Sequence, residues 1–376
     1  MKNIPATKPF FSTEDIAFIT ENFKEILSGK SFLSQYKFSS QFEQEFASYT
    51  GTDFAVSCNS GTSALELIFR ALDVHGKEVI LPSNTFIATA NAIMNAGGIP
   101  VFADCDDDMC LDYNDATKKI TSLTAAICHV HIGGIVSDNA LMLAQYCDDH
   151  GLYFVEDAAQ AHGSINKGLK AGTLGIAAGF SFYSTKVITT GEGGMVTTND
   201  EELVSKMKSI REFGKEKKGI FTNYHTRIGY NWRMPEVASL MGIRQLEAIE
   251  GFIDKRTNIA GAYDAILQEL NGVRIISPPE KSRFNYFKYL LILEKFDREK
   301  THKALEKNGI SPSGYVYELP LHKQPVFPVH NKINLPKTEY VCNKHICLPI
   351  YPSLEIKDAK YIAETLLKIL DSALFI

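Results

Sequence analysis

A lysine between small hydroxyl residues is the first candidate for covalent chemistry in this sequence. Lys186 follows Ser184 and Thr185, and the glycine-rich run 191–194 comes shortly after it. The preceding residues 179–183 alternate in a way that is typical of a buried strand, so the lysine would stand just past a strand end. A desolvated lysine amine loses its proton readily, and the neutral amine is the nucleophile that forms Schiff bases. The alternative is an ordinary loop lysine, and other residues must decide between the two.

Two further predicted strands end in residues that could bind charged groups. Asp157 directly follows the predicted strand 152–156, and a carboxylate at the end of a buried strand needs a cationic partner. The small-residue turn 59–63 follows the predicted strand 54–58 and enters a helix, whose first N–H groups favour a phosphate. Each feature has an alternative, because an Asp can cap a loop and many capped turns look similar.

The order of the predicted elements brings these strand ends together. Short apolar strands alternate with helices between residues 54 and 198. This pattern is typical of a mostly parallel sheet with helices on both faces. Ligands of such open α/β sheets bind beyond the carboxyl ends of the strands, so we expect Lys186, Asp157 and the turn 59–63 to face one cleft.

The pattern changes after Asn199. Residues 215–219 predict a basic turn, and Pro235 opens a long amphipathic helical stretch towards Leu270. A predicted strand at 287–293 and two later helices indicate a smaller α+β unit. The Pro-rich segment 312–336 predicts a loop over a site or a partner.

We therefore predict two domains. Residues 1–248 would form the large α/β domain, preceded by a helical segment that starts at Ser12 or Thr13. Residues 249–376 would form the small C-terminal α+β domain.

Composition excludes several classes of function. The formal net charge is −5 and no basic stripe is visible, which argues against nucleic acid and anionic membranes as partners. No apolar run is long enough to cross a bilayer, and the first residues, Met1 to Pro5, lack the apolar core of a signal peptide. The seven cysteines form no CxxC pair, so we expect reduced packing residues of a cytoplasmic protein and no zinc site.

An acidic run could be taken for a metal site. Asp104, Asp106, Asp107 and Asp108 stand close together, but no Gly or Glu occupies the spacing of a calcium loop. Consecutive charges of this kind are more typical of a solvated turn, so we predict no metal site.

Seven segments, in order, carry a family resemblance. They are SGTSAL, LPSNTFIATANAI, VEDAAQAHGS, GFSFYSTKVITTGEGGMVTT, GYNWRMPEVAS, PLHKQP and CLPIYP. Together they closely resemble the DegT/DnrJ/StrS sugar aminotransferases, which are pyridoxal 5'-phosphate enzymes of fold type I. The resemblance covers nearly the whole chain. It implies transfer of an amino group from an amino acid, with glutamate as the expected donor, to a nucleotide-linked keto sugar in amino-sugar and surface polysaccharide biosynthesis.

The resemblance also assigns roles around the cofactor. Lys186 would hold pyridoxal phosphate covalently and move the proton during transfer. Asp157 would pair with the pyridine nitrogen, and Gln160 would bind the ring hydroxyl. Phe86 and Ala159 would pack on opposite faces of the ring.

The resemblance also implies which residues bind the cofactor phosphate and that a second subunit takes part. Gly61, Thr62 and Ser181 would bind the phosphate of the cofactor through N–H and hydroxyl groups. Asn231 resembles the family residue that reaches the phosphate of a neighbouring subunit, which implies a homodimer with shared active sites.

The substrate side is where the sequence departs from the family pattern. Ser184, Gly133 and Ile176 replace residues that are common in the family. Tyr183 and His322 are candidates for substrate contact, with core packing or a backbone hydrogen bond as the alternatives. His131 is a further candidate for lining the site, with core packing as the favoured alternative.

Two other functions stay open. The chain could be a fold type I aminotransferase that acts on a non-sugar carbonyl compound, or a non-catalytic regulatory relative. An intact Lys186 and Asp157 argue against the regulatory reading, and Lys186 argues against related dehydratases, which carry His at this position.

Overall fold

A computed structural model of the protein describes residues 3–373 of the chain. Met1, Lys2 and residues 374–376, which the predicted domains and the predicted N-terminal segment include, lie outside the described residues.

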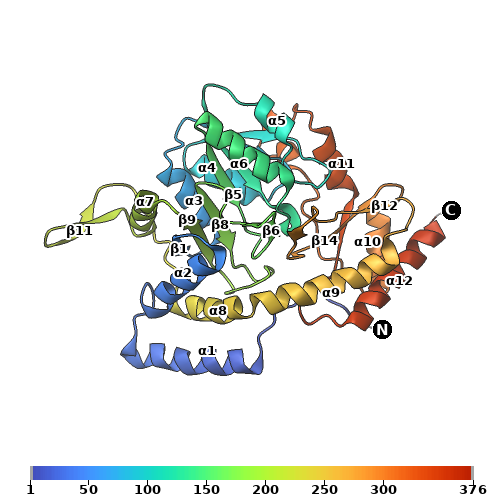
Figure 1. Ribbon diagram of the computed structural model, residues 1–376, viewed down its shortest axis with the longest axis horizontal. Helices are drawn as coiled ribbons and strands as arrows, with labels where there is room; N and C mark the ends of the chain where they lie inside the picture. The colour runs from blue at the N-terminus through green and yellow to red at the C-terminus, as the bar shows by residue number, and fades with distance from the viewer. Residues whose placement is uncertain (1–2, 374–376) are drawn as a thin grey trace.

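A seven-stranded sheet forms the centre of the large domain, with strand order β1-β9-β8-β5-β4-β2-β3 (Figure 1). Only β9 runs antiparallel to its neighbours in this sheet, which confirms the predicted mostly parallel sheet. The strands β1, β2, β5 and β8 therefore end at the same edge. The strand bounds are β1 Phe54–Cys58, β2 Glu78–Pro82, β3 Ile99–Ala103, β4 Thr124–Val130, β5 Tyr153–Asp157, β8 Ala177–Ser181 and β9 Gly194–Thr198.

Helices cover both faces of this sheet because the strand side chains alternate between two apolar surfaces. Val155 packs in the core shared with α3, α4 and α7, whereas its neighbour Phe154 packs in the core shared with α5 and α6. Phe180 joins a third core, which α2 and α8 complete. The helix bounds are α2 Lys37–Thr50, α3 Gly61–Ala71, α4 Ile87–Asn95, α5 Tyr113–Lys118, α6 Asp138–His150, α7 Glu201–Arg211 and α8 Glu236–Glu247.

The predicted long helical stretch from Pro235 to Leu270 is two helices. Pro235 is the N-cap of α8, and a second helix, α9 (Ile249–Leu267), follows after Ala248. In Figure 1 these helices run below the sheet from the large domain to the C-terminal part. The start of α9 lies next to the predicted boundary at residue 248, and the division into two domains stays a prediction.

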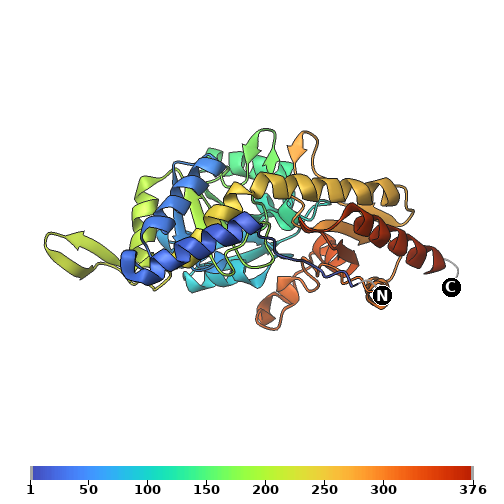
Figure 2. The ribbon, with the colours of Figure 1, turned by 90° about the horizontal axis from the view of Figure 1, so that it is seen from below.

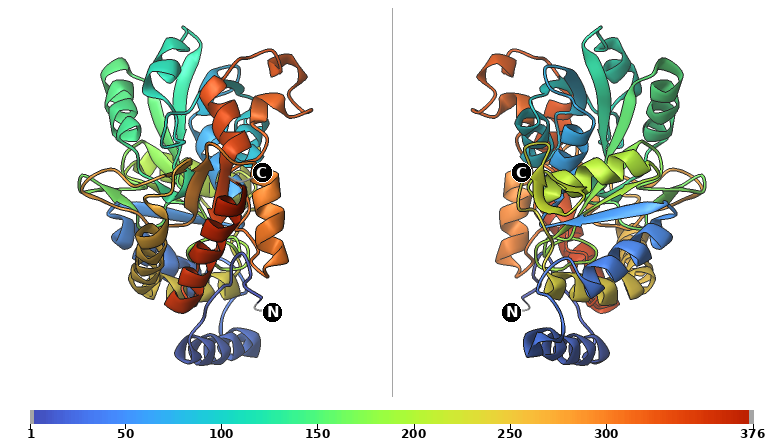
Figure 3. Two further views of the ribbon diagram at one scale, coloured as in Figure 1. Left: turned by 90° about the vertical axis from the view of Figure 1, so that its right-hand side faces the viewer. Right: turned by 90° about the vertical axis from the view of Figure 1, so that its left-hand side faces the viewer.

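The C-terminal part is built on a three-stranded antiparallel sheet with its own apolar core. The sheet has the order β12-β14-β15, and α9 and α12 pack side by side on it, as the left view of Figure 3 shows. The bounds are β12 Val273–Ile275, β14 Tyr289–Leu293, α10 Arg298–Lys307, α11 Pro336–Lys344, β15 His345–Leu348 and α12 Ile356–Ala373.

The predicted basic turn at residues 215–219 is wrong. Residues 215–218 form β10 (Lys215–Lys218), which pairs with β11 (Phe221–His225) in a hairpin that projects from the body of the molecule (Figures 1 and 2). The tip carries apolar side chains as well as lysines, because Ile220 is 92% exposed and Phe221 is 64% exposed. A projecting apolar tip is unusual for a segment that meets only water.

The start of the described chain contacts both parts of the molecule. The Ile4 N–H donates to the Gly309 carbonyl at 2.8 Å, and the Ser311 N–H donates to the Ile4 carbonyl at 3.0 Å. Helix α1 (Thr13–Glu25) then packs against α8 of the large domain and lies at the outside of the molecule in Figure 3. Its N-terminus is a capping box between Ser12 and Asp15.

The cysteines and the lengths of the helices concern the chain as a whole. All seven cysteines are unpaired and buried, as predicted for packing residues. In residues 3–373, no helix combines the length and the apolar character needed to cross a membrane.

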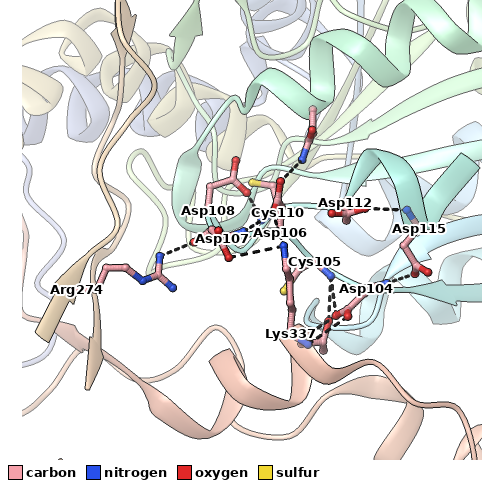
Figure 4. Close-up of polar contacts among 12 residues, drawn as sticks. Asp104, Cys105, Asp106, Asp107, Asp108, Cys110, Asp112, Asp115, Arg274 and Lys337 are labelled. Atoms are coloured by element: carbon pink, nitrogen blue, oxygen red, sulfur yellow. Dashed lines mark hydrogen bonds and ion pairs between the residues drawn. The ribbon is translucent and has the colours of Figure 1, made fainter. Parts of the chain in front are cut away.

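The acidic run joins the two parts of the molecule and is not simply a solvated turn (Figure 4). Asp104 is only 8% exposed, and its carboxylate accepts the N–H groups of Lys337 and Thr338 at 3.2 and 2.7 Å, which caps the start of α11. The Lys337 amine lies 2.7 Å from the Asp106 carboxylate. Within the described residues, no group of His, Cys, Asp or Glu is placed to hold a metal ion.

Asp108 carries an electrostatic cost in this run. Burial raises the pKa of Asp108 to about 6, although the Cys110 N–H donates to its carboxylate. The folded state therefore binds this proton more tightly than the unfolded state. The contribution of Asp108 to the stability falls as the pH rises from about 4 to about 6.

Replacing Asp108 with asparagine should raise the free energy of unfolding at pH 8 by about 1–2 kcal/mol and change it little near pH 4. The reason is that asparagine keeps the acceptor for the Cys110 N–H but carries no charge. Urea unfolding of both proteins at the two pH values measures the difference. The exposed Asp107, substituted in the same way, is the control, and an equal gain at both pH values would contradict the assignment.

Candidate active site

The predicted strand ends surround one cavity of about 430 Å³, which is large enough for a small-molecule cofactor. It opens at the shared edge where β1, β2, β5 and β8 end. Nine of the predicted site residues line it: Gly61, Thr62, Phe86, Asp157, Ala159, Gln160, Ser181, Tyr183 and Lys186.

Lys186 lies in the turn that follows β8, with its amine inside the cavity. Its Nζ is 4.8 Å from the centre of the Phe287 ring, and it has no hydrogen-bond or ion-pair partner among the described residues. Burial lowers the pKa of Lys186 to about 8, Asp157 opposes this shift, and Lys288 adds to it. A substantial fraction of the amine is therefore neutral near pH 8 and able to attack a carbonyl carbon.

Asp157 is the last residue of β5 and is only 6% exposed. The Thr89 hydroxyl donates to one carboxylate oxygen at 2.7 Å, and the Ala159 N–H donates to the other at 3.2 Å. Burial nevertheless raises the pKa of Asp157, because these two bonds and the Lys186 charge compensate the desolvation only in part. The site thus favours a cationic group that can pair with this carboxylate.

The other end of the cavity is an anion-binding turn. Ser60 caps α3 by accepting the Ser63 N–H at 3.1 Å, so Gly61 and Thr62 stand in the first helical turn, where N–H groups have no intrahelical acceptor. A Cβ at Gly61 would lie 2.6 Å from the Ser181 Cβ. Only glycine lets this turn approach β8 so closely.

The two ends of the cavity fit the two ends of pyridoxal phosphate. The turn at Gly61 and Thr62 suits the phosphate, the Asp157 carboxylate suits a protonated ring nitrogen, and the unpaired Lys186 amine suits the aldehyde. Phe86 is 56% exposed at the N-cap of α4 and presents an aromatic ring to the same cavity.

Gln160 is held in a fixed orientation at the cavity wall. Its side-chain oxygen accepts the Gly133 N–H at 2.8 Å, which directs its amide nitrogen towards the cavity. That nitrogen donates one N–H to the Tyr317 hydroxyl at 3.3 Å and has a second N–H to offer. The predicted hydrogen bond to a ring hydroxyl needs this donor.

The sequence interpretation missed the wall that the C-terminal part supplies. Phe287, Lys288, Tyr315 and Tyr317 all line the cavity. A signal existed for Lys288, because a charged residue interrupts the apolar run of the predicted strand 287–293. Both tyrosines lie in the Pro-rich segment, which was predicted to cover a site.

His322 is not at the cavity. Its ring is fully buried, with Nδ1 2.7 Å from the Ser83 hydroxyl and Nε2 3.1 Å from the Glu339 carboxylate. These bonds anchor the Pro-rich segment to the end of β2, so the geometry of this chain does not support the predicted substrate contact. His131 is a packing residue as expected, since it is fully buried and lies 2.9 Å from the Glu156 carboxylate.

Asn231 is exposed and does not line the cavity of its own chain. It lies opposite Glu212 in an isolated bridge near the base of the β10–β11 hairpin. Its predicted contact with the phosphate of a neighbouring subunit stays a prediction.

Comparisons with known proteins agree on one family. The sequence matches the DegT/DnrJ/EryC1/StrS aminotransferase family over residues 13–367. It is 32% identical over 371 residues to the GDP-perosamine synthase of Escherichia coli O157:H7, with 97% of this chain and 98% of the relative covered. It is also 32% identical over 373 residues to the dTDP-4-dehydro-2,3,6-trideoxy-D-glucose 4-aminotransferase of Saccharopolyspora spinosa, with 95% and 94% covered.

A solved structure supports the same conclusion. Helicobacter pylori PseC, an aminotransferase involved in the biosynthesis of pseudoaminic acid, superposes with a TM-score of 0.92 at 31% identity over 99% of this chain and 100% of that chain. The predicted fold type I architecture is thereby confirmed, and membership of the family implies pyridoxal phosphate as the cofactor. The chain belongs to the DegT/DnrJ/EryC1/StrS aminotransferase family.

Proposed function

We propose that this protein is a pyridoxal-phosphate aminotransferase that moves an amino group from glutamate to the ketone of a nucleotide-linked sugar. One observation carries the proposal above all: the partly buried Lys186 amine, which has no hydrogen-bond or ion-pair partner among the described residues, faces the same cavity as the Asp157 carboxylate. The named relatives of this chain, which include a GDP-perosamine synthase, support the class of acceptor.

The residues of the chain divide the work between binding and proton transfer. When bound, pyridoxal phosphate withdraws electrons from the carbon that carries the amine. Asp157 holds a proton on the pyridine nitrogen, and the N–H groups of Gly61 and Thr62 bind the phosphate. Lys186 accepts the α-proton of the amino acid in the first half-reaction and delivers a proton to the sugar carbon in the second.

The test uses the purified holoenzyme and ¹⁵N-glutamate. A panel of GDP-, UDP- and dTDP-linked 3-keto and 4-keto sugars is offered as acceptors, and mass spectrometry follows the label into the sugar. A labelled amino sugar supports the proposal. Transfer only to non-sugar keto compounds would favour the other aminotransferase class, and no transfer to any acceptor would favour a regulatory role.

We further propose a homodimer with shared active sites. Asn231 is exposed beside a hairpin whose apolar tip projects from the body, and a partner subunit would cover both.

Mixing two inactive variants should restore activity if the sites are shared. Lys186→Ala and Asn231→Ala homodimers would each lack one group in both sites. Random exchange makes half of the dimers mixed, and one site of each mixed dimer is intact, so roughly a quarter of the wild-type activity should return. Mixing Lys186→Ala with Asp157→Ala should restore no activity, because both residues line the cavity of one chain and every site of the mixed dimer lacks one of them. Equal recovery in both mixtures, or no recovery with Asn231→Ala, would contradict the role of Asn231.

A further inference from the structure

We propose that Lys288 binds an oxyanion of the substrate, either the carboxylate of the amino donor or a phosphate of the nucleotide. This inference rests on the proposed function, since it names the residue that recognises the charged group of the same reactants. Lys288 is not part of the segments that carry the family resemblance.

Lys288 shares the cavity and an aromatic ring with Lys186. Its side chain lines the cavity from the residue just before β14. The Lys288 Nζ is 5.2 Å and the Lys186 Nζ is 4.8 Å from the centre of the Phe287 ring, so the two nitrogens are at most about 10 Å apart, the sum of these distances. An anion bound at Lys288 would therefore be attached to a molecule whose reacting carbon can lie beside Lys186.

The charged residues of the cavity leave Lys288 without a counter-ion. Among the described residues that line it, the charged ones are Asp157, Lys186, Glu192 and Lys288. Lys186 is needed for covalent chemistry, and Asp157 is needed for the ring nitrogen. Among the lining residues that the structure describes, Lys288 is thus the cation whose charge stays available to a substrate anion.

The local contacts of Lys288 are neutral. Its amine donates to the Ser313 carbonyl and to the Ser313 hydroxyl, the latter at 2.8 Å, and no carboxylate lies within ion-pair distance in residues 3–373. Burial lowers the pKa of Lys288, which is the response of a cation with incomplete compensation. An arriving oxyanion would supply the missing charge and a charge-assisted hydrogen bond.

The decisive variant is Lys288→Met, which keeps the length of the side chain and removes the charge. Each half-reaction is measured separately in the holoenzyme, first with glutamate and then with the keto-sugar nucleotide. The KM in one half-reaction should rise by about 10- to 100-fold, the effect of losing a hydrogen bond to a charged group, whereas the KM of the other should change little. The affected arm identifies whether the carboxylate or the phosphate is bound.

A binding measurement separates this inference from the proposed function. Calorimetry with glutarate and with GDP, UDP and dTDP as probes reports anion binding even if the wild type transfers no amine to the sugars tested. Weaker binding of one probe class to Lys288→Met, with recovery in Lys288→Arg, supports the inference. Unchanged binding and unchanged KM in both arms would overturn it.

A purely structural role for Lys288 predicts a different result. Ser313→Ala removes the side-chain acceptor but leaves the amine, so it should keep the KM near that of the wild type. The exposed Lys360, changed to methionine, is the matched control for loss of a lysine charge. Equal KM changes in Ser313→Ala and Lys288→Met would show that only the packing of the segment matters and would overturn anion binding.

Discussion

Replacing Lys186 with alanine should abolish amino transfer, with a loss on the order of 10⁴-fold or more. The substitution removes both the amine that links to the cofactor and the group that moves the proton. Burial lowers the pKa of the Lys186 amine to about 8, and the charge of Asp157 opposes this shift, so the lost group is an amine already suited to attack a carbonyl carbon. Transfer is followed with ¹⁵N-glutamate, and the covalent link is followed by borohydride reduction and mass spectrometry of the peptide that contains residue 186.

The control for this variant is Lys360→Ala, which removes an exposed lysine of α12. It should show wild-type transfer and a labelled peptide at residue 186. A Lys186→Ala protein that still fixes the cofactor covalently, or that retains a tenth of the wild-type rate, would be incompatible with the proposed role.

Replacing Asp157 with asparagine should lower kcat by on the order of 10²- to 10³-fold, the usual effect of losing one preorganised electrostatic partner. Asparagine has nearly the same shape, and its one amide oxygen can still accept the Ala159 N–H while its amide N–H group donates to the Thr89 hydroxyl. It lacks the negative charge that keeps a proton on the ring nitrogen. The expected loss is therefore one of rate rather than of folding.

Thr89→Val is the matched control for Asp157→Asn. It removes one hydrogen bond to the same carboxylate and leaves the charge, so kcat should fall by only about tenfold. Stopped-flow measurement of the glutamate half-reaction gives both values, and thermal unfolding shows whether either variant is damaged. Equal losses in the two variants would mean that the hydrogen bond, and not the charge, is what matters.

The large-domain half of the site could be predicted because local sequence patterns determine it. Asp157 ends an apolar strand, Ser60 caps a helix, and Lys186 follows another strand. In a mostly parallel sheet these strand ends meet at one edge, so three separate local patterns were enough to predict a shared cavity.

The other wall depends on how the C-terminal part docks, which no local pattern specifies. Lys288 and Tyr317 reach the cavity only because β14 and the Pro-rich segment pack against the large domain. The acidic run was misinterpreted for the same reason, since Asp104 is buried by α11, whose residues are more than two hundred positions away in the chain.

His322 shows a different limit. Its segment resembles the family, but the direction of its ring depends on Ser83 and Glu339, which are distant in sequence from one another. A histidine that can donate and accept fits either a substrate or such neighbours equally well. Only the tertiary contacts decide between them.

The bridge between Ile4 and the segment at residues 309–311 has a consequence for synthesis on the ribosome. The nascent large domain can collapse as it emerges, but its leading residues have no partner until more than three hundred residues have been translated. Completion of the native state is therefore delayed until late in elongation, and a fusion tag placed before Ile4 would compete with that closing step more than one placed after α12.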